Sequence, residues 1–66
     1  MTFAQKLKAM RTDKGLSQNE LARLTDLSQP MIAQYELGIK HPHKNTLKEL
    51  ARKLNCKPED LKDDPE

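Results

Sequence analysis

The chain has 66 residues, of which 35% are hydrophobic and 33% are charged. This length suits one small domain, near the lower limit at which an apolar core alone stabilises a fold, and a large catalytic cleft is excluded. The only cysteine, Cys56, cannot form a disulfide within the chain, and no apolar run is long enough for a signal peptide or a membrane span. We therefore expect a cytoplasmic protein.

The formal net charge of +2 conceals an uneven distribution along the chain. Residues 1–57 hold eleven Lys or Arg and five Asp or Glu, a balance of +6, whereas residues 58–66 hold one and five, a balance of −4. A basic body favours a polyanionic partner, because neutralising phosphate groups releases counterions. Solvation of helix surfaces explains at least half of these cations equally well.

Apolar residues recur at helical spacing, and no segment alternates with a period of two, so the fold is predicted to be all-α. The expected helices cover residues 2–13, 17–24, 28–36, 45–54 and 58–62. Three apolar stripes are predicted to form the core: Phe3, Leu7 and Met10; Leu21 and Leu24; Leu47, Leu50, Ala51 and Leu54. The prediction is a compact five-helix bundle, with one domain over residues 1–62 and an acidic, solvated tail over residues 63–66.

Residues that favour helix starts precede most of these segments. Thr2, Ser17 and Ser28 are the expected N-caps of the first three helices, because their hydroxyl groups can accept a bond from a backbone amide in the first turn. Asn45 or Thr46 is expected to cap the fourth helix. Pro58 is expected to open the fifth, since a first turn does not need its missing amide proton.

The second and third predicted helices leave only residues 25–27 between them, which forces a sharp crossing and indicates a helix-turn-helix. On the third helix, Ile32 and Tyr35 share one face with Glu36, and the opposite face carries Pro30, Ala33, Gln34 and Leu37, with Gln29 at the N-terminal tip. We expect the first face to be buried and the second to be exposed.

An exposed second helix of this motif fits the major groove of B-form DNA. Gln29 and Gln34 each carry an amide that can pair with adenine through two hydrogen bonds, while Pro30 or Ala33 can contact a thymine methyl group. Taken alone, two exposed glutamines are more simply polar surface. Their spacing on one face of a helix-turn-helix favours the DNA interpretation.

The stretch LSQNELARLTDLSQPMIAQYELG (residues 16–38), with TLKELARKLNC and EDL after it, resembles the phage repressor/Cro-type helix-turn-helix family. This family includes lambda-repressor-like domains, XRE-like regulators, restriction-modification controller proteins and some antitoxins, and the resemblance runs from about Phe3 to Leu61. It implies a transcription regulator, most simply a repressor, that binds double-stranded DNA sequence-specifically with its third helix and needs no cofactor. It also implies a homodimer on a palindromic operator, in the bacterial cytosol or on the nucleoid.

The resemblance also implies a role for particular residues. Base contacts fall to Gln29, Pro30, Ala33 and Gln34. Phosphate contacts fall to Ser17, Gln18, Lys40, His41, His43, Lys44 and Asn45. Arg11 and Glu36 match a buried ion pair that joins the first helix to the third and has a structural role.

Three departures from the family pattern affect these expectations. Asp26 stands where a glycine usually holds the bend, and aspartate tolerates the left-handed conformation better than most residues. Leu37 replaces a polar residue and gives up one phosphate contact. The third helix contains no Arg or Lys, so the commonest contact to guanine is missing and the operator should lean towards A·T pairs.

Two other function classes are alternatives to a DNA-binding regulator. His41 and His43 lie close together, but they lack the further ligands that a metal site needs, and no catalytic constellation is present, so neither a metal nor an enzyme activity is expected. The main alternative is a protein-interaction adaptor with the same fold, such as an antitoxin or a bridging factor. The missing cations of the third helix favour it slightly, and the basic residues 40–44 argue against it.

Overall fold

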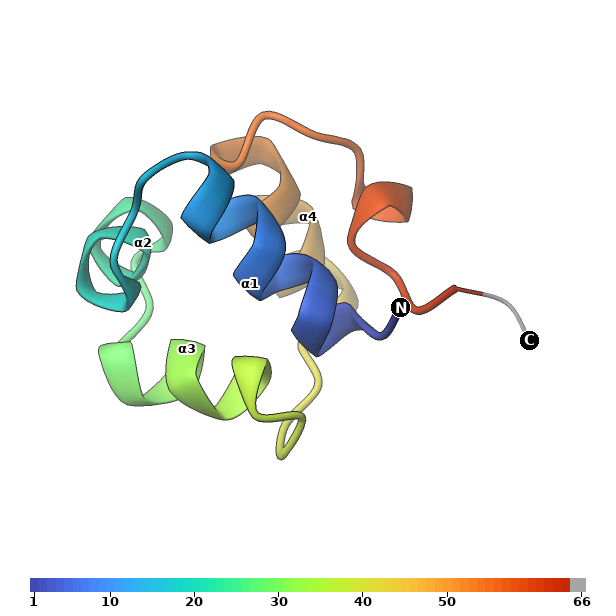
Figure 1. The fold of residues 1–66 in the computed structure, drawn as a ribbon, viewed down its shortest axis with the longest axis horizontal. Helices are drawn as coiled ribbons and strands as arrows, with labels where there is room; N and C mark the ends of the chain where they lie inside the picture. The colour runs from blue at the N-terminus through green and yellow to red at the C-terminus, as the bar shows by residue number, and fades with distance from the viewer. Residues whose placement is uncertain (65–66) are drawn as a thin grey trace.

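The structure, a computed structural model, describes residues 1–64, so the last two residues of the predicted tail lie outside the described residues. It contains four α-helices, α1 (Phe3–Asp13), α2 (Gln18–Thr25), α3 (Gln29–Glu36) and α4 (Lys44–Lys53), and one 3₁₀ turn, η1 (Pro58–Asp60). No strand occurs within residues 1–64, which confirms the all-α prediction. In Figure 1, α1 crosses the front, α2 lies on the left, α3 runs along the bottom and α4 lies behind α1.

The predicted fifth helix is wrong, because its segment forms only the three-residue turn η1. The amides of Leu61 and Lys62 both donate to the carbonyl of Pro58, at 3.0 and 3.2 Å, and the helical hydrogen bonding stops there. A helix this short does not offset the cost of its nucleation, so its course depends on tertiary contacts. Leu61 is fully buried, as expected for a residue that folds back on the core.

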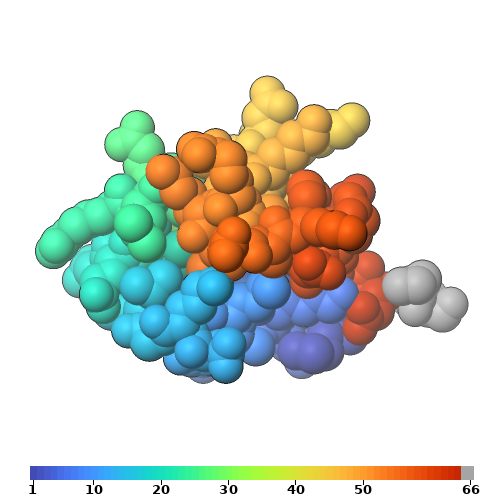
Figure 2. Space-filling view, turned by 90° about the horizontal axis from the view of Figure 1, so that it is seen from above, coloured from blue at the N-terminus to red at the C-terminus, as the bar shows by residue number. Residues whose placement is uncertain are grey.

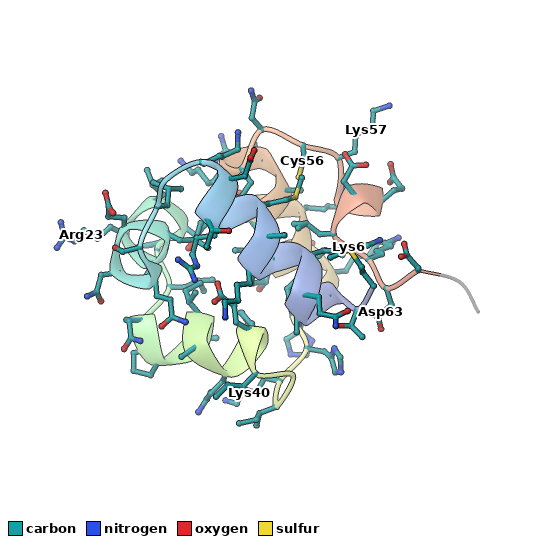
Figure 3. All side chains as sticks on the ribbon, viewed as in Figure 1. Lys6, Arg23, Lys40, Cys56, Lys57 and Asp63 are labelled. Carbon is teal, nitrogen blue, oxygen red and sulfur yellow. The ribbon has the colours of Figure 1, made fainter. Side chains whose placement is uncertain are left out.

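The chain leaves η1 to meet the start of α1. The Asp64 amide donates to the Met1 carbonyl at 2.9 Å, and the Asp63 carboxylate accepts a hydrogen bond from the Phe3 amide. Lys6 Nζ lies 2.5 Å from Asp64 Oδ1, and Figure 3 shows Lys6 and Asp63 on this side of the molecule. Asp63 and Asp64 therefore hold the first turn of α1, although both remain exposed to solvent.

The core takes at least one fully buried side chain from each of the four α-helices. Seven residues have no exposed surface: Leu7, Leu21, Ile32, Leu50, Ala51, Leu54 and Leu61. Phe3 and Tyr35 join α1 to α3 through an edge-to-face contact with ring centroids 5.9 Å apart, a favoured geometry for aromatic pairs. Figure 2 shows the closed surface that α1, the end of α4 and η1 form on the side away from α3.

The predicted core position of Leu24 is wrong, because its side chain is 45% exposed. Thr25, four residues after Leu21, occupies the buried position. Its hydroxyl donates to the Leu21 carbonyl at 2.8 Å, which satisfies the buried polar group inside the helix.

Local signals predicted the first three helix starts and failed for the fourth. Thr2, Ser17 and Ser28 are the observed N-caps, each accepting from a backbone amide in the first turn. The N-cap of α4 is His43 instead of Asn45 or Thr46, and its side chain makes no capping bond. The Leu47 amide donates to the His43 carbonyl at 2.9 Å, so the helix begins one turn before Leu47, which packs against the core.

Candidate nucleic-acid interface

The turn between α2 and α3 depends on Asp26, which takes the left-handed conformation at φ 59° and ψ 30°. The Leu27 amide donates to the Ala22 carbonyl at 3.0 Å and closes the end of α2. Ser28 then starts α3 by accepting from the Met31 amide at 3.2 Å. The expected helix-turn-helix therefore forms with aspartate at the bend.

One face of α3 is buried and the other points outward, as the spacing of its residues predicted. Ile32 and Tyr35 are buried in the core. The outward residues, which we call the reading face, are Gln29, Pro30, Ala33, Gln34 and Leu37. Of these, Pro30 and Leu37 are exposed, and the other three are half-buried. The helix that carries the reading face, α3, runs along the lower edge of the molecule in Figure 1.

A chain of hydrogen bonds runs from α1 to the first residue of α3. Arg11 Nε lies 2.6 Å from Glu36 Oε2, and Arg11 Nη2 donates to Glu36 Oε1 at 3.0 Å. Gln18 Nε2 donates to the same Glu36 oxygen at 3.1 Å, and Gln29 Nε2 donates to Gln18 Oε1 at 2.8 Å. The ion pair expected from the resemblance is thus connected to the reading face through Gln18.

The ion pair between Arg11 and Glu36 is shielded from solvent. The side chains of Arg11 and Glu36 are 11% and 4% exposed. Hydrogen bonding to Glu36 raises the pKa of Arg11 above its ordinary value, and this outweighs the opposing effect of desolvation. Arg11 also donates to the Leu16 carbonyl at 2.7 Å, so it fixes the segment that leads into α2.

The start of α2 offers donor groups beside the reading face. The Ser17 hydroxyl accepts from the Glu20 amide at 3.0 Å, and the Ser17 amide donates to Glu20 Oε1 at 2.9 Å. Hydrogen bonding from Ser17 to the exposed Glu20 carboxylate, chiefly from the Ser17 backbone amide, lowers the pKa of that carboxylate. The hydroxyl proton of Ser17 and the second amide proton of Gln18 remain for an external acceptor.

The loop residues that are predicted to contact the DNA phosphates lie before and at the start of α4. They are all exposed: Lys40, His41, His43, Lys44 and Asn45. Lys44 and Asn45 are the first two residues of α4, whose first turn contains no acidic residue and has no side-chain cap. Such a helix start favours an anion, because its amides point outward and the helix dipole is positive there. Figure 3 shows Lys40 at the lower edge, next to the end of α3.

Comparison with known proteins identifies the family. A family model described as helix-turn-helix, HTH_3, matches residues 7–61. The chain belongs to this helix-turn-helix family. The resemblance stated from the sequence is therefore confirmed. None of the curated protein sequences matches the chain significantly.

Solved structures of helix-turn-helix proteins superpose closely on the chain. The restriction-modification controller protein C.AhdI from Aeromonas hydrophila is 36% identical, with 89% of each chain covered and a TM-score of 0.85. An HTH_3 family transcriptional regulator from Vibrio cholerae is 34% identical over 89% of this chain and 33% of its own, with a TM-score of 0.83. The P22 c2 repressor in complex with a synthetic operator has a TM-score of 0.89 with 94% of each chain covered; at 24% identity it shows the fold alone.

Two further structural findings concern the other function classes. Residues 1–64 contain no group of three or more His, Cys, Asp or Glu side chains that could hold a metal ion. Within the same described part, no helix of this helix-turn-helix protein is long and apolar enough to cross a membrane.

Sequence reasoning missed the two hydrogen bonds of Gln18, because the resemblance assigned this residue only to a phosphate. A signal for them exists in this helix-turn-helix chain, since Gln18 and Gln29 are the first residues of two successive helices joined by a tight turn. It also missed the exposure of Ile39, which is 68% exposed beside Leu37. Ile39 follows Gly38 beyond the helix end, so no helical periodicity places it in the core.

Proposed function

We propose that this protein is a sequence-specific, double-stranded DNA-binding transcription regulator that inserts α3 into the major groove. The observation that carries the proposal is the reading face of α3, which ends next to the basic, uncapped start of α4. A groove-reading helix needs polar and apolar groups for base edges together with cations for the adjacent phosphates. The reading face and the loop from Lys40 to Lys44, which follows the end of α3, supply both.

Gln29 is the proposed base-contacting residue whose side-chain amide is already oriented by a hydrogen bond within the protein. One of its amide protons is donated to Gln18, so its carbonyl oxygen and its second amide proton remain. Adenine presents a matching acceptor and donor, N7 and the N6 amino group, at its major-groove edge. Gln34 offers the same two groups one turn later, and Pro30 and Ala33 suit thymine methyl groups. The operator is therefore expected to lean towards A·T pairs.

The phosphate contacts are proposed at the two helix starts that flank α3. At the start of α2, the Ser17 hydroxyl and the Gln18 amide proton would meet one strand. At the start of α4, the phosphate set is Lys40, His41, His43, Lys44 and Asn45. Because each neutralised phosphate releases counterions, binding should weaken as the salt concentration rises. The logarithm of the affinity should fall against the logarithm of the salt concentration with a slope of about 0.9 per phosphate contact.

A homodimer on a palindromic site follows from the small size of one interface, because a single such domain buries little surface and specifies few base pairs. Among residues 1–64, the exposed large hydrophobic side chains are Met1, Leu24, Leu37 and Ile39, and none lies on α4 or η1. We therefore propose that two copies assemble on DNA, with half-sites about one helical turn apart. Repression is the simplest outcome, since occupying the site requires no surface beyond this interface.

The test is selection of bound duplexes from a random-sequence pool at two salt concentrations. Enrichment of a two-fold symmetric, A·T-leaning motif that persists at the higher salt concentration would support the proposal. Retention of all duplexes alike at low salt would reduce the function to non-specific binding. Failure to retain any duplex at low salt would overturn the proposal.

A protein-interaction adaptor is the second candidate, and one observation favours it. Leu37 and Ile39 are 73% and 68% exposed and stand on either side of Gly38 in the chain. Exposed apolar residues of this kind can mark a protein contact. The same selection separates the two candidates, because an adaptor would not enrich a DNA motif.

A further inference from the structure

We propose that Leu37 is a specificity-determining residue, whose side chain packs against the 5-methyl group of a thymine in the major groove. This inference rests on the proposed DNA-binding function and extends it to a residue that the sequence comparison credits only with a lost phosphate contact. It identifies the ligand chemistry as a 5-methylpyrimidine. It also gives a function to a large apolar side chain that is otherwise left in solvent.

The geometry of α3 places Leu37 at the C-terminal end of the reading face and near its centre line around the helix axis. Its amide donates to the Ala33 carbonyl at 2.9 Å, and its backbone keeps a right-handed conformation at φ −83° and ψ −9°, so it continues the phase of the helix. At about 100° per residue, Leu37 lies within roughly 20° of Pro30 around the helix axis, and Ala33 lies about 40° from Leu37. Ile32, which is fully buried, is on the opposite side.

The chemistry of this stripe points to methyl groups. Pro30, Ala33 and Leu37 carry no side-chain hydrogen-bonding group, so they cannot replace the polar contacts that a phosphate or a base amino group makes. In the major groove, thymine is the unmodified base that presents a methyl group. From Pro30 to Leu37 the helix rises by about 10 Å, which corresponds to roughly three base steps along one strand. The stripe therefore fits a short run of thymines.

The position of the cations supports contact with DNA at this end of α3. Lys40 lies three residues beyond Leu37 in the chain, and Lys44 begins α4, so the segment that follows the exposed leucine carries positive charge. A surface for an apolar protein partner would more typically have uncharged residues around its centre, with the charges confined to a rim. The mixed surface formed by Leu37 and its basic neighbours instead matches a groove lined by bases and bordered by phosphates.

The test uses the duplex that the selection enriches and replaces its thymines, one at a time, with deoxyuridine. Deoxyuridine keeps the pairing with adenine and lacks only the 5-methyl group. For the wild-type protein, we expect at least one replacement to weaken binding about fourfold, which corresponds to ~0.8 kcal/mol for one buried methyl group. With Leu37→Ala, the ratio of thymine to deoxyuridine affinity at that position should fall to about one.

Ile39→Ala is the matched control, because Ile39 is comparably exposed but follows Gly38 and does not continue the helix. It should leave the thymine-to-deoxyuridine ratio as in the wild type, and thermal melting should show that both variants fold. An unchanged ratio in Leu37→Ala would overturn the inference while the selected motif still upholds the DNA-binding function. A Leu37→Ala variant that binds every duplex as tightly as the wild type would likewise overturn it and assign the leucine to a protein contact. If no duplex is selected at all, the proposed function fails and the inference fails with it.

Discussion

The buried ion pair between Arg11 and Glu36 gives the most direct test of how this small domain is stabilised. In Arg11→Met, the Glu36 carboxylate, which is only 4% exposed, would keep the hydrogen bond from Gln18 and lose its counter-charge. Breaking a buried pair costs about 3 to 5 kcal/mol, and the remaining hydrogen bond argues for the lower end, about 3 kcal/mol. Because a chain of this size has a total stability of roughly 3 to 10 kcal/mol, the melting temperature should fall by about 12 to 24 °C.

The assay is urea and thermal unfolding followed by circular dichroism, with Arg52→Met as the matched control. Arg52 also pairs with a glutamate, Glu49, at 2.6 Å, but these side chains are 66% and 43% exposed. Solvent screens such a pair, so its loss should leave the free energy of unfolding unchanged within error. Equal effects of the two substitutions on the free energy of unfolding would refute this reasoning.

Three further predictions concern the DNA interface and the ends of the chain. Gln29→Ala should weaken binding to the selected operator by about 1 to 3 kcal/mol and leave binding to random duplex nearly unchanged, as measured by titration of both DNAs; equal losses would remove its base-contacting role. Lys44→Ala should weaken all duplexes alike and reduce the slope of log affinity against log salt by about one unit, and an unchanged slope would remove Lys44 from the phosphate set. The hydrogen bond from Lys6, followed by that from the Met1 amino group, lowers the pKa of Asp64 from 3.8 to about 2. The stability that this carboxylate contributes is therefore present above about pH 4 and lost as the pH falls towards 2, so Asp64→Asn should flatten the decline in the urea midpoint over that range. Parallel curves for the variant and the wild type would show that the pairing is absent in solution.

The sequence predicted α2 and α3 well because their boundaries depend on neighbouring residues. The capping box of Ser17 with Glu20 and the cap at Ser28 act within one turn, so they can be identified without knowledge of the fold. The left-handed bend at Asp26 was expected from the family resemblance, because a glycine usually stands at that position. The pairing of Arg11 with Glu36 joins residues 25 positions apart, and it was expected only from the family resemblance.

The errors arose where tertiary packing decides the outcome. The start of α4 is set by Leu47 reaching the core, so the better capping residues Asn45 and Thr46 fall inside the helix. Leu24 has the same spacing from Leu21 as many core residues, but the packing of α2 buries Thr25 instead. The segment from residue 58 ends as a single turn because Asp63 and Asp64 bond to the start of α1, a contact between the two ends of the chain.

The hydrogen bonds of Gln18 connect the stability of the fold to the proposed base contact. A carboxylate can only accept hydrogen bonds, so Glu36 requires Gln18 to present its amide NH2 group. The side-chain carbonyl of Gln18 then faces Gln29, which must in turn donate to it with its own amide NH2 group. This leaves the carbonyl and one amide proton of Gln29 for a base, in the polarity that adenine complements. Arg11 holds the carboxylate that fixes this order, so part of the preference at that base pair is determined by α1, a helix that makes no base contact in the proposed complex.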